Sequence, residues 1–319
     1  MPGISAQAAC KLRMSLMKKH GGLVNHFRRH WQKHLMMLPV LIILTVFNYV
    51  PMVGILMGFE NYMPNLGLFR SPWVGWQWFE FMFKMNNFTS VVWNTLYISL
   101  LKIFTLQVAS LTFALMLNEL RLRRTRSLIQ GAAIFPNFLS WVICAGIIKD
   151  IVAQEGIINQ VIFALTGSNV SFLTDSGWFT VLLVVTHIWK DAGYNAVIIM
   201  AALAGIDPNL YEAADIDGAT RFQKMKYVTI PGVSHIVVLL TILALGGVMN
   251  GGFDQIWNLY NSTVRSSAEI IDTYVYRKGI GSGMYSLGTA VGLFKSVVGV
   301  ILLTVSHWSA KKFAGYQVF

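Results

Sequence analysis

Charged residues are scarce in this chain of 319 residues, where Asp, Glu, Lys and Arg together make up 12%. A soluble domain normally carries about 25%. Apolar residues make up 55%, and several runs reach the roughly 20 residues that cross a bilayer as a helix. The shortage of charge therefore excludes an ordinary soluble enzyme and predicts an all-α membrane protein with several spans.

Cysteine is rare as well, with Cys10 and Cys144 the two examples in the sequence. The topology predicted below places them in different compartments, so we expect no disulfide between them. Neither lies at a metal-binding or redox spacing. The seven histidines gather near predicted helix ends and in the basic amino-terminal segment, so we predict no metal site.

Motifs for nucleotide binding and hydrolysis are also missing. The chain contains no Gly-Lys dipeptide, which excludes a P-loop, and it has neither a His-Glu-x-x-His pattern nor a Gly-x-Ser-x-Gly elbow. We therefore predict that the chain is not an enzyme, that it holds no cofactor of its own, and that it cannot drive transport with ATP by itself.

Long apolar segments are what the chain does have, and six of them are predicted to span the membrane. These predicted spans are residues 34–59, 90–117, 128–148, 178–203, 233–250 and 286–307. Pro39 and Pro51 predict kinks in the first span. Between the spans we expect an outer segment over 60–87, a short outer helix near 156–165 and an outer loop over 251–285.

This topology divides the chain into five parts. They are a basic cytoplasmic segment over 1–33, the first span over 34–59, the outer interfacial segment over 60–87, a core over 88–307 with a cytoplasmic loop over 205–232, and a cytoplasmic tail over 308–319. For the segment 1–33 two interpretations stay open, an amphipathic helix on the inner membrane face or a solvated tail. The first run lacks a small-residue cleavage site, so we expect no secretory signal peptide.

The net charge of +11 follows from where the basic residues lie. Sixteen of the 25 lysines and arginines fall in four segments on one predicted side, six on the other, and three inside spans. This asymmetry is the positive-inside pattern, which places both termini in the cytoplasm. It also explains the basic charge without nucleic acid, which we do not expect as a partner.

The outer segment 60–87 is rich in tryptophan and phenylalanine, including Trp73, Trp76 and Trp78. Aromatic rings at this density favour the membrane–water interface. Stacking against sugar rings is the alternative, and interfacial anchoring is the favoured of the two.

A polar stretch from Asp207 to Pro231 interrupts the apolar runs and carries signals for two short helices. Asp207 can cap a helix that starts at Pro208, and Gly218 permits the turn that ends it. Thr220 and Gln223 have the spacing of a capping box for a second helix. We expect Pro231 to end that helix. A folded helix-turn-helix between spans predicts a docking element for a cytoplasmic partner.

The same stretch resembles the EAA loop of ABC importer permeases through Glu-Ala-Ala at 212–214, Asp-Gly-Ala at 217–219 and Ile-Pro at 230–231. The segments 71–75, 136–141 and 189–194 are similar to the oligosaccharide and polysaccharide branch of that family, and within it to permeases of bacterial alginate importers. The resemblance implies a type I permease fold, with a five-helix core over about 88–307 and one added amino-terminal helix.

In the family, this loop is the coupling helix that seats in a groove of an ATPase subunit. The residues carried over to that role are Tyr211, Glu212, Ala213, Ala214, Asp217, Gly218, Ala219 and Pro231. The resemblance also implies a bacterial inner-membrane location, a second homologous permease, two ATPase subunits that bind ATP and magnesium, an extracytoplasmic solute-binding protein and a saccharide substrate.

Ionisable and polar residues inside spans are costly and mark a candidate translocation pathway. The candidates are Lys102, Trp189, Lys190, Asp191, Tyr194, Asn195, Asn250 and Lys295. Three lysines against one aspartate suit an acidic saccharide. For Lys190 and Asp191 the alternative is a buried polar pair that holds two helices together, and for Lys102 and Lys295 it is snorkelling to an interface.

Three further interpretations stay open. Gly288, Gly292 and Ser296 form a small-residue face that predicts close helix packing, either with a partner permease or within the chain. An ion-coupled secondary carrier could use the intramembrane Lys and Asp, although we find no internal inverted repeat. A membrane-embedded glycan enzyme would need a convergent acid–base pair, and the scattered carboxylates offer none.

Overall fold

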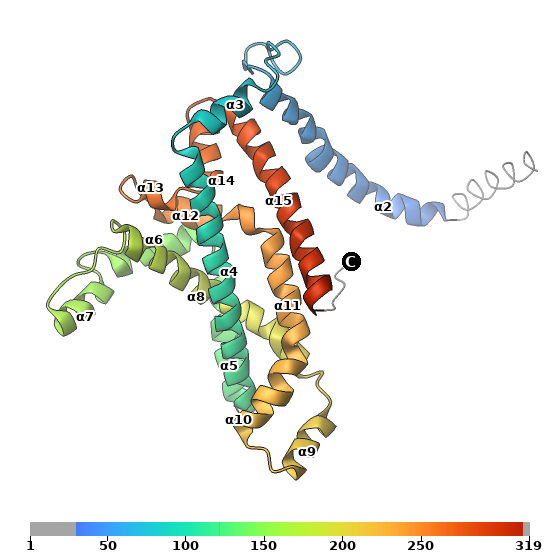
Figure 1. Ribbon diagram of the computed structural model, residues 1–319, viewed down its shortest axis with the longest axis vertical. Helices are drawn as coiled ribbons and strands as arrows, with labels where there is room; N and C mark the ends of the chain where they lie inside the picture. The colour runs from blue at the N-terminus through green and yellow to red at the C-terminus, as the bar shows by residue number, and fades with distance from the viewer. Residues whose placement is uncertain (1–29, 121, 315–319) are drawn as a thin grey trace, which may run out of the picture. The chain divides into compact units, whose positions relative to one another are not determined.

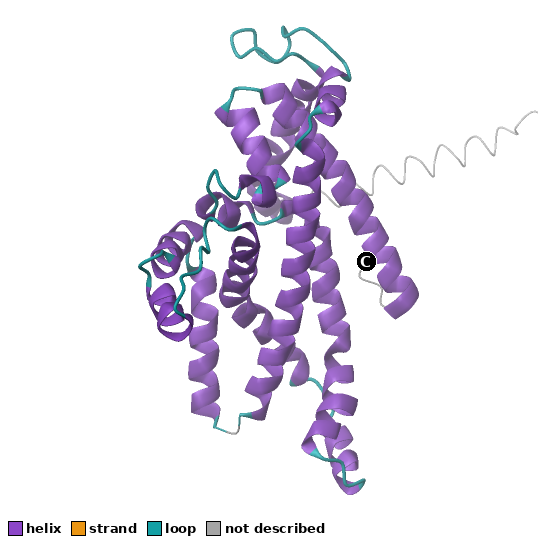
Figure 2. Ribbon diagram, turned by 60° about the vertical axis from the view of Figure 1, so that its left-hand side comes forward, coloured by secondary structure: helices purple, strands orange, loops and turns teal. Residues whose placement is uncertain are grey.

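The computed structural model describes residues 30–120 and 122–314. These residues are helical, with one isolated antiparallel bridge between Glu60 and Trp73 and no longer strand among them. Figure 2 accordingly draws helices and loops only. The predicted amphipathic helix before residue 30, Cys10, Arg121 and the last five residues of the tail lie outside the described residues.

The chain divides into two compact units, residues 1–56 and 57–319. The first unit contains α2 (Trp31–Leu44), which continues through the π-helical η1 (Thr45–Tyr49) into the 3-10 helix η2 (Val50–Phe59). Pro39 lies within regular α-helix, whereas Pro51 lies where the helix has tightened to 3-10 geometry. The regular α-helix ends at Leu44, and the π-helical turn that follows it precedes Pro51, which has no N–H to donate to the preceding turn.

Four helical segments of the described chain are long and apolar enough to cross a membrane. They are Trp31–Phe59, Phe88–Glu119, Arg221–Gly246 and Tyr285–Trp308. Two bent helix pairs, residues 123–166 and 176–216, pass the same test and raise the number of spans to as many as six. The predicted all-α architecture is therefore confirmed.

The predicted third span is wrong as a single rod, because the chain breaks in its middle. The segments of this region are α5 (Arg123–Ile134), the 3-10 turn η3 (Phe135–Phe138), α6 (Trp141–Val152) and α7 (Ile157–Thr166). The axis turns by 104° between 123–138 and 141–166. Pro136 removes a donor at the break, and Ser140 then caps α6 through its bond from the Ile143 N–H. The short helix predicted near 156–165 is α7.

The segment 251–285, predicted as an outer loop, is not irregular, because it folds into short helices. They are α12 (Phe253–Leu259), α13 (Arg265–Ala268), α14 (Ile271–Val275) and η6 (Tyr276–Gly281), and the 3-10 turn η5 (Val248–Asn250) precedes them. Gly251 and Gly252 adopt φ of +56° and +85°, which glycine reaches without strain, and they turn the chain out of η5. Ile256, Ile270 and Tyr274 are then buried against the long helices.

Pro231 does not end the second helix of the polar stretch, contrary to the prediction. α10 (Arg221–Lys224), the π-helical η4 (Met225–Thr229) and α11 (Ile230–Gly246) form one continuous helix of 26 residues. Pro231 sits in the first turn of α11. The π-helical turn before it shifts the hydrogen-bond pattern, so the missing N–H and the bulky ring cause no break.

The second unit is organised around α4 (Phe88–Glu119), which packs against α8 (Ser176–Leu203) and α11. α11 in turn packs on α15 (Tyr285–Ala314). α3 (Gln77–Lys84) lies at the Phe88 end of α4, and α10 lies at its Glu119 end (Figure 1). The two ends of α4 are thus covered by different parts of the chain. A helix of 32 residues is about 48 Å long at the usual rise per residue, so these two ends lie far apart.

Glycines set two of the close helix contacts. Gly193 of α8 faces the Ala133 carbonyl of α5, where any Cβ would clash with backbone. A Cβ on Gly288 of α15 would lie 3.0 Å from the Cα of Gly279 in η6, so this part of the small-residue face packs within the chain. Gly292 has open space at the corresponding position.

Gly193→Ala should lower the stability of the chain by about 1–3 kcal/mol, the usual cost of overpacking a closed contact. The effect is measured as a lower thermal unfolding midpoint of the purified protein in detergent. Gly131→Ala is the matched control, because Gly131 lies in α5, the helix that Gly193 faces, with open space around it. Equal midpoints for the two variants would contradict the proposed close contact.

Candidate functional site: the loop before α11 and the polar groups of the spans

The loop between α8 and α11 begins with α9 (Pro208–Ile216), as the sequence predicts. The Asp207 carboxylate accepts a hydrogen bond from the Asn209 N–H at 3.0 Å, and Pro208 occupies the first turn. Gly218 adopts φ of +73° and ends the helix, with the Ala219 N–H bonded to the Ala214 carbonyl at 2.9 Å. Both predicted signals of this helix are confirmed.

The predicted capping box is also confirmed, at the start of α10. The Gln223 N–H donates to the Thr220 hydroxyl at 3.4 Å, and the Thr220 N–H donates to the Gln223 side-chain oxygen at 2.7 Å. Each residue satisfies a backbone donor of the other, so the turn between α9 and α10 has a defined geometry.

Two side-chain bonds tie α9 to the helix that follows it. The Tyr211 and Thr229 hydroxyls lie 3.0 Å apart, and the Lys224 ammonium lies 2.6 Å from the Asp215 carboxylate. Thr229 belongs to η4, which runs without a break into α11. These bonds therefore favour movement of α9 and the long helix together as one rigid unit.

The outward face of this hairpin combines apolar and acidic groups. Ile216 is 87% exposed and Phe222 is 68% exposed, although both are large apolar side chains. Glu212, Ala213 and Asp217 are exposed beside them, and Glu212 makes no ion pair with any residue that the structure describes. Such a face is what a protein partner would cover.

The predicted loop residues fall into two groups. Glu212, Ala213, Asp217 and Gly218 are exposed, whereas Tyr211, Ala214 and Ala219 are half-buried. Pro231 is exposed but lies in the first turn of α11, after the hairpin. The structure thus separates an outward face from the residues that fix its position.

Lys190 is buried and caps the break in the chain at Pro136. Its ammonium donates to the carbonyls of Pro136 and Asn137 at 3.0 Å and to that of Leu139 at 2.5 Å. It also lies 5.6 Å from the centre of the Trp141 ring. One side chain on α8 therefore donates to three carbonyls at the helix break, of which the Pro136 carbonyl also accepts from the Leu139 N–H at 3.2 Å.

Asp191 belongs to a different cluster, as the 100° turn between neighbouring helical positions predicts. Its carboxylate lies 2.8 Å from His187 Nδ1 and accepts a bond from the Asn137 amide at 2.8 Å. His187 was not among the residues predicted from the sequence. The i, i+4 spacing to Asp191 could have found it, because residues at that spacing share a helix face.

Lys102, Asn250 and Lys295 lie around the turn at Gly251. The Lys102 ammonium is buried and donates to the Gly251 carbonyl at 3.0 Å. Lys295 forms an ion pair with Asp272 at 2.5 Å, and these two residues line a cavity of 460 Å³ together with Asn250. Asp272 was missed because the sequence analysis placed it in an outer loop.

The structure therefore places Lys190 and Asp191 at the break around residues 136–139, and Lys102, Asn250 and Lys295 around the turn at Gly251. Trp189 and Tyr194 are 47% and 52% exposed on α8, and Asn195 is half-buried. Lys102 and Lys190 have no carboxylate within ion-pair distance in the described ranges. A role for any of the eight pathway candidates in a passage stays a prediction.

No group of three or more His, Cys, Asp or Glu side chains could hold a metal ion within the described part of the chain. Cys144 is a buried free thiol in the apolar cluster between α6 and α8.

The comparisons with known proteins agree with this geometry. The profile of the family described as "Binding-protein-dependent transport system inner membrane component" matches residues 109–314. The chain is 42% identical over 281 residues to Protein LplB of Bacillus subtilis, covering 88% of each chain. It is 38% identical over 287 residues to the polygalacturonan/rhamnogalacturonan transport system permease protein YteP of the same organism, covering 90% of this chain and 89% of that one.

A solved structure shares the fold. A chain of a bacterial ABC transporter involved in the import of the acidic polysaccharide alginate superposes with a TM-score of 0.84 at 31% identity, covering 91% of this chain and 99% of that one. The alginate ABC transporter in complex with an alginate pentasaccharide-bound periplasmic protein gives a TM-score of 0.84 at 30% identity. The predicted type I permease fold is therefore confirmed.

Lys190→Met should lower the stability by at least about 1–3 kcal/mol, the cost of leaving one buried carbonyl without a donor. The measurement is thermal unfolding in detergent, with hydrogen exchange of the amides around 136–141 as the local readout. Lys226→Met is the matched control, because Lys226 is exposed on η4. Unchanged exchange around residue 136 would show that Lys190 does not hold the break.

Tyr211→Phe should loosen α9 from η4, because it removes the bond to Thr229 and leaves the ring in place. The expected loss is about 1 kcal/mol, which corresponds to about fivefold faster hydrogen exchange of the α9 amides. Tyr227→Phe serves as the control, since the Tyr227 side chain is 67% exposed on the same π-helical turn. An equal change in both variants would contradict the tie between the two helices.

Proposed function

The chain belongs to the family of inner-membrane components of binding-protein-dependent transport systems, and from this premise we propose that it is the transmembrane subunit of an ATP-driven importer of saccharides. The observation that carries the proposal is the hairpin formed by α9 and α10. It exposes an acidic and apolar face, and its internal bonds fix it to the 26-residue helix that contains α11.

The partners follow from the same premise. The chain has no P-loop, so ATP and magnesium belong to separate ATPase subunits, two in number. A second homologous permease completes the passage, and an extracytoplasmic solute-binding protein delivers the saccharide. In the proposed orientation both termini and the hairpin lie in the cytoplasm, in agreement with the excess of basic residues on that side.

The proposed mechanism is mechanical. ATP binding closes the ATPase dimer, and closure moves the α9–α10 hairpin because it is seated on the ATPase. The Tyr211–Thr229 contact and the continuous helix carry that movement into α11, which packs against α4 and α15. The assembled complex must bind ATP more tightly in one state than in the other. The ratio of these two affinities limits how far ATP shifts the equilibrium between the inward and outward states.

The proposed substrate is an acidic saccharide that contains uronate units, of which alginate is one example. Two similar proteins support this class, because their names specify polygalacturonan/rhamnogalacturonan and alginate. The buried lysines Lys102 and Lys190 add positive charge to the spans, with no carboxylate at ion-pair distance among the described residues. The proposed passage runs past the two sets of polar residues around Asp191 and Asn250.

The ion pairs in the spans favour one second candidate, an ion-coupled carrier that would use Asp191 with His187 or Asp272 with Lys295. A carrier of this kind takes up its solute without ATP and is indifferent to a change at Glu212. Uptake into vesicles loaded with or without ATP therefore separates the two functions.

Glu212→Ala should reduce ATP-driven uptake by more than tenfold while the complex of two permeases and two ATPase subunits still assembles. The reason is that a carboxylate seated against a cation of the ATPase is costly to lose once the contact is buried. Uptake of a labelled acidic oligosaccharide into proteoliposomes is the readout, and co-purification with the ATPase reports assembly. Glu80→Ala, at an exposed glutamate of α3, should leave both unchanged.

Undiminished uptake by the Glu212 variant, or uptake by the wild-type complex without ATP, would overturn the proposed function.

A further inference from the structure

A polar recess lies at the Phe88 end of α4, the end remote from the α9–α10 hairpin. Its walls are residues 85–91, where α3 joins α4, and residues 265–278, which run from α13 into η6. The volume is 590 Å³, within the roughly 300–1,000 Å³ of pockets that take small molecules. The recess contains none of the residues of the hairpin or of the predicted passage.

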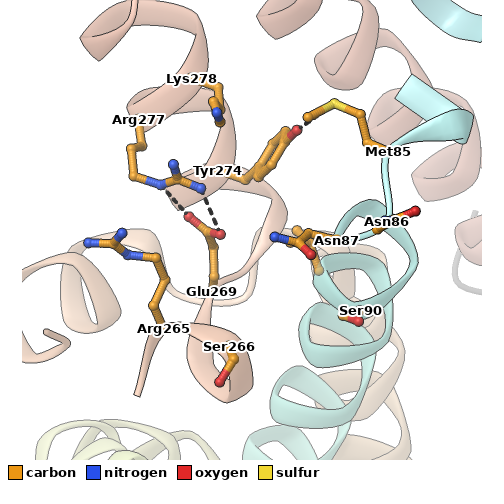
Figure 3. A pocket seen from close by; sticks show the side chains of 11 residues that line it. Met85, Asn86, Asn87, Ser90, Arg265, Ser266, Glu269, Tyr274, Arg277 and Lys278 are labelled. Atoms are coloured by element: carbon orange, nitrogen blue, oxygen red, sulfur yellow. Dashed lines mark hydrogen bonds and ion pairs between the residues drawn. The ribbon is translucent and has the colours of Figure 1, made fainter. Parts of the chain in front are cut away.

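One wall of the recess is positively charged. It carries Arg265, Arg277 and Lys278 against a single carboxylate, that of Glu269. Arg277 uses both ends of its guanidinium on the Glu269 carboxylate, at 2.7 and 2.9 Å (Figure 3). The hydrogen bonds that Arg277 donates to Glu269 raise the pKa of Arg277, so this pair stays ionised and neutralises itself.

The other two cations of this wall are uncompensated. Arg265 and Lys278 form no ion pair with the residues described by the structure. The recess therefore keeps an excess of two positive charges beside a fixed pair of a buried Glu269 and a half-buried Arg277. An anion that enters it would replace water on both cations.

The facing wall supplies neutral hydrogen-bonding groups. Asn86, Asn87 and Ser90 come from the start of α4, and Figure 3 shows Asn87 pointing across the recess toward Glu269. These three side chains make no hydrogen bond to other described residues. The Tyr274 hydroxyl, by contrast, donates to the Met85 sulfur at 3.0 Å and closes the apolar floor.

We propose that this recess is a capture site for a carboxylate-bearing sugar unit, an inference that rests on the proposed import of an acidic saccharide. The sugar carboxylate binds the cationic wall that carries Arg265 and Lys278, on either side of the Arg277–Glu269 pair in Figure 3, and the ring hydroxyls bind the amides and the hydroxyl of the facing wall. A small inorganic anion would use the cations and leave the three neutral groups unused. A sugar acid uses both walls, and the concave shape suits a ligand of that size.

The position of the recess gives the capture site its role. In the proposed orientation the Phe88 end of α4 faces the side from which the solute-binding protein delivers. A uronate unit bound in the recess therefore contacts this chain before it reaches the polar residues around Asp191 and Asn250. The site thus selects for carboxylated saccharides ahead of the spans.

The test compares Arg265→Gln/Lys278→Gln with the wild type in the complete complex, in lipid nanodiscs without nucleotide. The probes are a mannuronate tetrasaccharide and the same tetrasaccharide with its carboxyl groups reduced to alcohols. Calorimetric titration should show at least tenfold weaker binding of the acidic probe to the variant and equal binding of the neutral probe. Arg70→Gln/Lys84→Gln removes two exposed cations elsewhere and should bind like the wild type.

A charge-retaining variant, Arg265→Lys/Lys278→Arg, should keep most of the affinity and so separates lost charge from lost folding. Equal binding of the acidic probe to the wild type and Arg265→Gln/Lys278→Gln would overturn the capture site. A second result would also overturn it: Arg265→Gln/Lys278→Gln binds the saccharide normally, but the binding protein stimulates its ATP hydrolysis less than that of the wild type. The two cations would then form a docking surface for a protein.

ATP-driven uptake, measured in parallel, distinguishes this inference from the proposed function. The capture site alone is overturned if the wild type shows ATP-driven uptake and Arg265→Gln/Lys278→Gln binds the acidic probe as the wild type does. Binding that depends on these two residues, without any ATP-driven uptake by the wild type, overturns the proposed importer and leaves the capture site standing.

Discussion

The three hydrogen bonds from the Lys190 ammonium to the carbonyls after Pro136 are the interaction on which the bundle depends. A bilayer offers no water to a carbonyl that a helix break has freed, so the protein must supply the donor itself. Lys190 does so from α8 and thereby fixes the 104° bend between α5 and α6. Lys102 repeats the arrangement at the Gly251 turn. Two buried cations thus allow a helical membrane protein to change direction inside its own core.

The same constraint explains how the α9–α10 hairpin is joined to the spans. A clean helix end at Pro231 would have left a flexible connection between the hairpin and α11. The π-helical turn at η4 instead absorbs the proline, so that α10 and α11 are one helix. The Tyr211–Thr229 contact then adds a second attachment. A docking element with two attachments transmits displacement, whereas a single flexible one would dissipate it.

Charge is distributed along the second unit in a way that fits an acidic cargo. In the spans, Asp272 pairs with Lys295, and Asp191 is bonded to His187 and to the Asn137 amide, so neither carboxylate lies at ion-pair distance from Lys102 or Lys190. The recess at the Phe88 end of α4 adds two uncompensated cations. Because α4 runs from this recess to the region of the hairpin, one helix connects the end that would meet the saccharide with the end that would meet the ATPase.

The sequence by itself determined the membrane class, the helical architecture and the local structure of the hairpin, because hydropathy, caps and glycine turns are properties of neighbouring residues. It also marked Lys190 and Asp191 as important. It could not show that Lys190 would bond to carbonyls more than fifty positions away, that His187 would be the partner of Asp191, or that residues 251–285 would fold into buried helices. Those outcomes, and the recess formed by segments 85–91 and 265–278, were decided by tertiary packing, since they depend on which distant backbone groups and charges meet inside the bundle.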